Sequence, residues 1–165
     1  MTTLRALFEK WGLSSLTLDM GFLQAEFTPK DVDKQAAWEL YVELITRITT
    51  QELADDEGDE KTALDSVYAV FTETREIIKR HRGAIGFTKV AVVVLNKKLR
   101  PFLAKWHRVS TRGALDGKAK EFRRELAEIQ PVLRSYAKMM AEMAGAAELA
   151  EAVEPMASPP PEPHR

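Results

Sequence analysis

The clearest fold signal lies between residues 117 and 145, in the stretch GKAKEFRRELAEIQPVLRSYAKMMAEMAG. Large apolar side chains recur in it at alternating steps of four and three residues, at Phe122, Leu126, Ile129, Leu133, Tyr136, Met140 and Met143. This spacing puts them on one face of an α-helix, as in a heptad seam. Burying each such side chain stabilises a fold by roughly 1.5–3 kcal/mol, so we expect this helix to line a core or an oligomer interface. Pro131 predicts a bend within it.

Three more helices are predicted upstream, over residues 30–51, 59–82 and 84–107. Thr28–Pro29 is a start signal for the first, because a hydroxyl can cap a helix and proline suits its first position. A cationic run before Gly83 is a stop signal for the second, since cations are favourable at a helix C-terminus and glycine commonly follows it.

The helix at residues 84–107 is ambiguous. Residues 90–95 are apolar and mostly β-branched, so they would also suit a buried strand. The later spacing of Leu95, Leu99 and Trp106 favours a helix that is apolar all round and therefore central. The sequence leaves both alternatives open for residues 90–95. Pro101 predicts a kink, since proline lacks an N–H and crowds the preceding turn.

The remaining segments complete a single, mainly α-helical domain over residues 1–148. We expect an up-down four-helix bundle core, a short N-terminal helix at residues 4–11 and a small β-hairpin at residues 14–27, where apolar and polar side chains alternate. The hairpin would either pack on the helices or accept a strand from another chain. Residues 149–165 are rich in proline and are predicted to form a disordered tail.

The composition indicates a soluble protein. Its 165 residues carry a formal net charge of −1, so no global charge draws the chain to nucleic acid or membrane. The lack of cysteine excludes disulfides, thiolate metal sites and cysteine nucleophiles, and fits a reducing compartment. The N-terminus has charges where a signal peptide needs apolar residues, and the apolar run Val90–Leu95 is far shorter than the ~20 residues of a membrane helix. We therefore expect a cytoplasmic protein without a membrane partner.

No catalytic or metal-binding constellation is visible in the sequence. The three histidines, His81, His107 and His164, have no ligand partner at helical spacing, and the Glu-x-x-His pattern of di-iron bundles does not occur. The acidic segment 52–60 superficially suggests a calcium loop, but its glycine is misplaced and no glutamate closes it. Glycine-rich phosphate loops and Gly-x-Ser-x-Gly are absent as well. The sequence predicts no enzyme activity, no cofactor and no metal.

Basic residues gather in the segment 97–124, where few acidic side chains accompany them. In an up-down bundle this segment lies at the same end as residues 52–60, so the two would neutralise each other. The alternative is a basic end that receives an acidic partner or a nucleic-acid backbone. The candidate partner-binding residues are Arg100, Lys105, His107, Arg108 and Arg112. Phe102 and Trp106 would support them from the core, although their place among cations would also suit nucleobase stacking.

Two stretches carry a resemblance to known proteins: AAWELYVELITRI at residues 36–48 and VLNKKLRPFLAKWH at residues 94–107. Over most of its length outside the tail, the chain is similar to an uncharacterised bacterial family of small helical proteins associated with conflict and antiphage-defence loci. The resemblance implies an accessory or regulatory protein that works beside a larger effector, and it transfers no catalytic residue.

These observations together predict a non-enzymatic interaction module that binds a protein partner or a second copy of itself. The alternative is a nucleic-acid-binding accessory protein that uses the basic segment 97–124.

Overall fold

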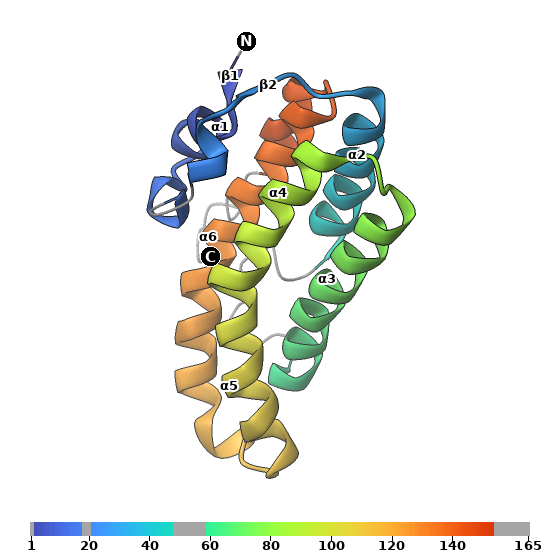
Figure 1. The fold of residues 1–165 in the computed structure, drawn as a ribbon. Helices are drawn as coiled ribbons and strands as arrows, with labels where there is room; N and C mark the ends of the chain where they lie inside the picture. The colour runs from blue at the N-terminus through green and yellow to red at the C-terminus, as the bar shows by residue number, and fades with distance from the viewer. Residues whose placement is uncertain (1, 18–20, 48–58, 154–165) are drawn as a thin grey trace, which may run out of the picture.

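The computed structural model describes residues 2–17, 21–47 and 59–153, and these are mainly helical (Figure 1). The longer helices are α2 (Asp31–Ile45), α3 (Glu60–Arg80), α4 (Ile85–Val94), α5 (Arg100–Thr111) and α6 (Ala119–Met143). The N-terminal part contributes α1 (Leu4–Lys10), the 3₁₀ turns Ser14–Thr17 and Gly21–Gln24, and a small antiparallel sheet of β1 (Thr2–Thr3) and β2 (Glu26–Phe27). The predicted helical class is confirmed.

The long helices lie side by side, with α1 at one edge of the group. α2 packs on α6, α3 and α4, and α3 also contacts α5 and α6. Figure 1 shows α5 and α6 extending together beyond the start of α3, to the turn that joins them. At the other end of α6, Lys10 and Trp11 donate hydrogen bonds of 2.9 and 2.8 Å to the carboxylate of Glu142, which ties α1 to the helical core.

Short polar side chains begin the helices. The hydroxyl of Thr3 accepts a hydrogen bond of 3.0 Å from the amide of Ala6 in α1, and Asp59 accepts one of 2.8 Å from the amide of Thr62 in α3. Both bonds satisfy amides that have no partner within the first turn of a helix. The helix predicted at residues 59–82 is thus present as α3, with cations in its last turn as expected.

Asp33 serves two helices at once. One oxygen of its buried carboxylate accepts a 3.0 Å hydrogen bond from the amide of Lys30, at the start of α2. The other accepts a 3.0 Å bond from the amide of Phe87, at the start of α4. The carboxylate therefore lies where the positive ends of two helix dipoles meet, which favours its negative charge.

A π turn, Leu95–Leu99, joins α4 to α5 directly before Pro101. Buried side chains continue through it, because Leu95 is followed by buried Leu99, Phe102 and Trp106. The π turn adds one residue to the helix, about 100° of rotation. The helix expected at residues 84–107 is therefore built from two α-helical pieces in register with one core.

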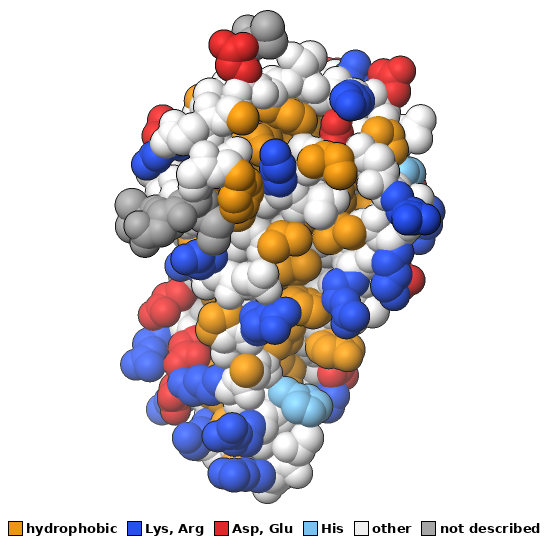
Figure 2. All heavy atoms as spheres, viewed as in Figure 1, with side chains coloured by type: hydrophobic (Ala, Val, Ile, Leu, Met, Phe, Trp, Pro, Cys, Tyr) orange, Lys and Arg blue, Asp and Glu red, His pale blue; other side chains and the backbone are white. Residues whose placement is uncertain are grey.

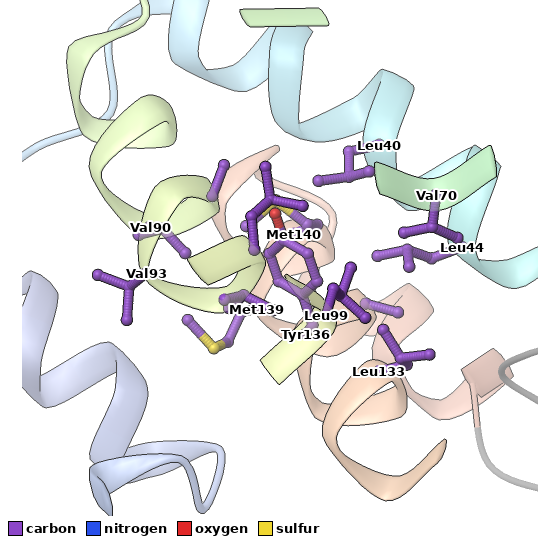
Figure 3. Packing of buried hydrophobic residues seen from close by; sticks show 14 of the residues in the cluster. Leu40, Leu44, Val70, Val90, Val93, Leu99, Leu133, Tyr136, Met139 and Met140 are labelled. Atoms are coloured by element: carbon purple, nitrogen blue, oxygen red, sulfur yellow. The ribbon is translucent and has the colours of Figure 1, made fainter. Parts of the chain in front are cut away.

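One apolar cluster fills the space between the helices (Figure 3). Tyr136 of α6 stands at its centre, among side chains of α2, α3, α4 and the π turn. Every member of the predicted α6 seam is buried: Phe122, Leu126, Ile129, Leu133, Tyr136, Met140 and Met143. α6 continues through Pro131. Residues 90–95, left open between helix and strand, are helical: 90–94 lie in α4 and Leu95 begins the π turn. Val90, Val93 and Val94 are buried, as a central helix requires.

The predicted hairpin at residues 14–27 is wrong. Ser14–Thr17 and Gly21–Gln24 are 3₁₀ turns, and β2 pairs instead with β1, with Thr2 opposite Phe27. The two-residue alternation misled because it does not separate buried from exposed side chains in this segment. Leu13 and Leu16, three residues apart, are both buried, as the period of a 3₁₀ turn requires.

The first long helix, predicted over residues 30–51, ends at Ile45, and Thr46 and Arg47 follow it in a turn. Residues 149–153 do not belong to a disordered tail, because they form the end of the 3₁₀ turn Ala147–Val153. The hydroxyl of Tyr41 donates a 3.0 Å hydrogen bond to the carbonyl of Leu149, and Val153 is buried. Residues 154–165, and residues 48–58 with most of the acidic segment, lie outside the described residues.

Candidate functional site

One side of the α4–α5 pair gathers the features that a partner could use. We define the α4–α5 face by its solvent-accessible residues Ile85, Lys89, Val92, Lys97, Arg100, His107 and Arg108. Figure 2 looks onto this side, where cationic side chains accompany apolar ones along the molecule. The π turn keeps the face continuous, because without its extra residue the exposed sides of α4 and α5 would point about 100° apart.

The cations of the α4–α5 face have few acidic neighbours. Among the described residues, no carboxylate forms an ion pair with Lys97, Arg100 or Arg108. The guanidinium carbon of Arg100 lies 5.9 Å from the ring centre of Phe71 in α3, within cation–π range. Within the part of the chain that the structure describes, the positive charges of these side chains therefore remain available to an external anion.

The five predicted partner-binding residues do not all share this face. Arg100, His107 and Arg108 belong to it, and Arg112 lies exposed at the C-terminus of α5. Lys105 instead points to α6, where its ammonium bonds to Glu121 at 2.7 Å and to Glu125. These two hydrogen bonds raise the pKa of Lys105 above its ordinary value. Sequence proximity had placed Lys105 with the others, but Glu121 and Glu125 of α6 already bind its ammonium.

Trp106 and Phe102 lie beneath the face, as expected of supporting residues. Trp106 is fully buried and meets Phe122 edge-on at 5.1 Å between ring centres, while its indole N–H donates a 2.8 Å hydrogen bond to Glu125. Neither ring has a face open to solvent, which confirms their expected place in the core and leaves no surface for the alternative of nucleobase stacking. The exposed aromatic rings among the described residues are elsewhere: Tyr68 on α3 is 59% exposed, Trp38 on α2 is 45% exposed and Phe22 is 44% exposed.

Neutralisation of the basic segment 97–124 by acidic residues is partial. Arg123 donates a 2.6 Å hydrogen bond to Glu60 at the start of α3, and this bond lowers the pKa of Glu60. Lys118 lies 4.0 Å from Glu121 within its own segment. The acidic residues 52–58 lie outside the described residues, so their part in the predicted neutralisation stays a prediction.

The structure also has a hollow that the sequence did not predict. It measures about 220 Å³ and lies between β2 and the start of α4, beside the upper end of the α4–α5 face. Its lining includes apolar Leu4, Phe22, Phe27 and Ile85, together with Lys30 and Lys89. The hollow joins residues from three separate segments, and no spacing within one segment signals such a meeting.

A second hollow, of about 330 Å³, lies between α2 and α3 and exposes Trp38 and Val42. The carboxylate of Glu39 on its edge is already engaged, because it pairs with Arg80 and, at 2.7 Å, with His81. Glu43 in the lining pairs with Arg47, whereas Glu73 forms no ion pair among the described residues, so this hollow combines apolar surface with negative charge.

In the part of the chain that the structure describes, no cluster of histidine and acidic side chains could hold a metal ion. No helix among the described residues has the length and apolar character that crossing a membrane would need. Comparison of the chain with protein-family models, with curated proteins and with solved structures gave no match. The site must therefore be interpreted from its own geometry.

Proposed function

We propose that this protein is a non-enzymatic interaction module that binds an acidic protein partner through its α4–α5 face. The observation that carries the proposal is the set of cations, Lys97, Arg100 and Arg108, that lie on one rigid face without an acidic partner among the described residues. Exposed Ile85 and Val92 on the same face favour a protein, because protein interfaces combine apolar contacts with charge complementarity.

In this proposal the helical core is a scaffold, with its four long units in the up-down order of a four-helix bundle. The protein acts as an accessory component in the cytoplasm, beside a larger effector, as its resemblance to a family from bacterial defence loci implies. Arg100, His107 and Arg108 contact the partner, Arg112 extends the contact at the end of α5, and Lys105 contributes by holding α5 against α6.

A charge-reversal variant tests the proposal. Arg100→Glu plus Arg108→Glu should lose the partner from native-cell pull-downs, while Lys61→Glu plus Lys79→Glu, an equal charge change on exposed sites of α3, should retain it. The captured protein is then purified and its binding to both variants is measured directly. If both variants bind it as the wild type does, the proposal fails.

The alternative is a nucleic-acid-binding accessory protein. The observation in its favour is the exposed ring of Tyr68 on α3, on which a base could stack. Tyr68 precedes by one helical turn Phe71, whose ring contacts the cation Arg100. Phosphate contacts release counterions, so affinity for duplex DNA would fall by about 0.9 log units per contact for each log unit of salt. Anisotropy titrations with DNA and RNA at low salt, without any response, would exclude this alternative.

A further inference from the structure

The hollow at the top of the α4–α5 face has the size of one anchoring side chain. Pockets for whole small molecules measure about 300–1,000 Å³, whereas an apolar cavity of about 150 Å³ accepts a benzene ring. At 220 Å³ this hollow falls between the two. Ile85 and Phe22 stand at its mouth, 57% and 44% exposed, so apolar surface here is already offered to solvent.

The charge around the hollow favours a partner with carboxylates. Lys30 and Lys89 line it, and the Lys89 ammonium lies 5.9 Å from the ring centre of Phe22. Two carboxylates are also present, but that of Asp33 is buried and bound to two backbone amides, which leaves exposed Glu26. Farther down the same face stand Lys97 and Arg100, which form no ion pair among the described residues.

We propose that this hollow takes the bulky apolar side chain of an acidic peptide segment of the partner, whose carboxylates meet Lys89 and then Lys97 and Arg100. The inference rests on the proposed function and specifies the chemistry of the partner. Central, well-packed apolar anchors commonly carry most of the binding energy of an interface, and charges around them steer the approach. A phosphate backbone has no side chain to place among Phe22, Phe27 and Ile85.

Paired synthetic peptides test the anchor. The first probe is a fluorescein-labelled peptide of aspartate, glutamate and serine with one central phenylalanine, and the second has alanine in its place. Fluorescence anisotropy with the full chain at low salt should give about tenfold tighter binding of the phenylalanine peptide, as expected of an anchor side chain. Equal affinity of the two peptides, or no binding of either, overturns the inference.

Variants at the hollow locate the binding. Ile85→Asp should weaken binding of the phenylalanine peptide. It should preserve the fold, because an acidic residue suits the first turn of a helix. Val42→Asp, which changes an exposed apolar residue on α2, is the matched control and should bind as the wild type does. Lys30→Glu plus Lys89→Glu should also lower the affinity for the phenylalanine peptide by about tenfold, given the coupling energies of close charge pairs across interfaces. An equal loss in Val42→Asp overturns the inference.

The proposed function and the anchor can fail separately. If Arg100→Glu plus Arg108→Glu abolishes binding of both peptides while the variants at the hollow have no effect, the anchor is rejected and the proposed function stands. Duplex DNA and phosphatidylserine vesicles are titrated in parallel. If the variants at Ile85 and Lys89 weaken binding of DNA or of vesicles more than binding of the phenylalanine peptide, the hollow belongs to that ligand and the inference is overturned. Self-association of the chain that Ile85→Asp abolishes would overturn it as well.

Discussion

The ring of Phe27 in β2 fills the space beside Gly86 in α4: a Cβ on this glycine would lie 1.9 Å from Cε2 of the ring. Replacing a helical glycine by alanine ordinarily stabilises a helix by up to about 1 kcal/mol. At this position we expect the opposite sign, because the ring must move. Gly86→Ala should lower the free energy of unfolding by about 1–3 kcal/mol, measured by urea denaturation.

Gly117, in the 3₁₀ turn Asp116–Lys118, offers a control for Gly86. A Cβ on Gly117 would meet nothing within 4 Å, so Gly117→Ala should leave stability nearly unchanged. In the double variant Gly86→Ala plus Phe27→Ala, the destabilisation should be smaller than the sum of the two single variants. Gly86→Ala creates a steric clash with the ring, and Phe27→Ala removes that ring. A stabilised Gly86→Ala single variant would contradict this close approach.

The two amides bound by Asp33 predict a large effect from a small substitution. Asp33→Ala leaves the amides of Lys30 and Phe87 without their acceptor at the start of α2 and α4, and should destabilise the protein by about 1–3 kcal/mol. Asp33→Asn keeps one side-chain oxygen as an acceptor, so its free energy of unfolding should lie between those of Asp33→Ala and the wild type. The nearby Asp31→Ala removes only an exposed pair with Lys34 at 3.7 Å and should change little in the same denaturation experiment.

Substitution of two buried tyrosines by phenylalanine should change the stability of the protein in opposite directions. The hydroxyl of Tyr136 is buried without a hydrogen-bond partner among the described residues, and burial raises its pKa well above the ordinary value. Tyr136→Phe should therefore stabilise the protein by about 1 kcal/mol or more. Tyr41→Phe loses the hydrogen bond to Leu149 and should destabilise it by about 0.5–1.5 kcal/mol. Thermal melts of both variants decide the signs, and a destabilised Tyr136→Phe would reveal a partner for the hydroxyl.

The ion pair of Glu60 and Arg123 predicts a pH dependence. Its hydrogen bond lowers the pKa of Glu60 below the ordinary 4.5, so the pair stabilises the fold above that pH. This contribution is lost as the pH falls through the folded-state pKa. Glu60→Gln should therefore be less stable than the wild type at neutral pH, with the difference shrinking in acid. Glu128→Gln, on an exposed residue, is the control, and a pH-independent difference for Glu60→Gln would contradict the assignment.

Helix positions were predictable where one period governs a long segment. The α6 seam from Phe122 to Met143 repeats over the whole helix, and every member is buried. The segment 14–27 was not predictable in the same way, because a strand and a 3₁₀ turn differ there by only one residue in period. β2 forms only because β1, far away in sequence, pairs with it.

The sequence predicted which charged residues are candidates for the site, but not toward which neighbouring element each side chain points. The basic segment 97–124 is evident from composition, yet Lys105 is bound by Glu121 and Glu125 of α6, whereas Arg108 forms no ion pair among the described residues. Their assignment requires the phase of the helix, which the one-residue shift at the π turn alters. The apolar spacing gives no signal for that shift, because Leu95, Leu99, Phe102 and Trp106 recur at steps of four, three and four, as in a regular helix.

The joint Leu95–Leu99 has a consequence for how this chain can diverge. Asn96 and Lys97 are exposed there, so their identities can change without disturbing the apolar interior. A gain or loss of one residue in the same segment is different, because it would turn α5 by about 100° and bring Trp106 out toward water. Length is therefore the conserved property to expect at this joint, while its composition is free to adapt to whatever binds nearby.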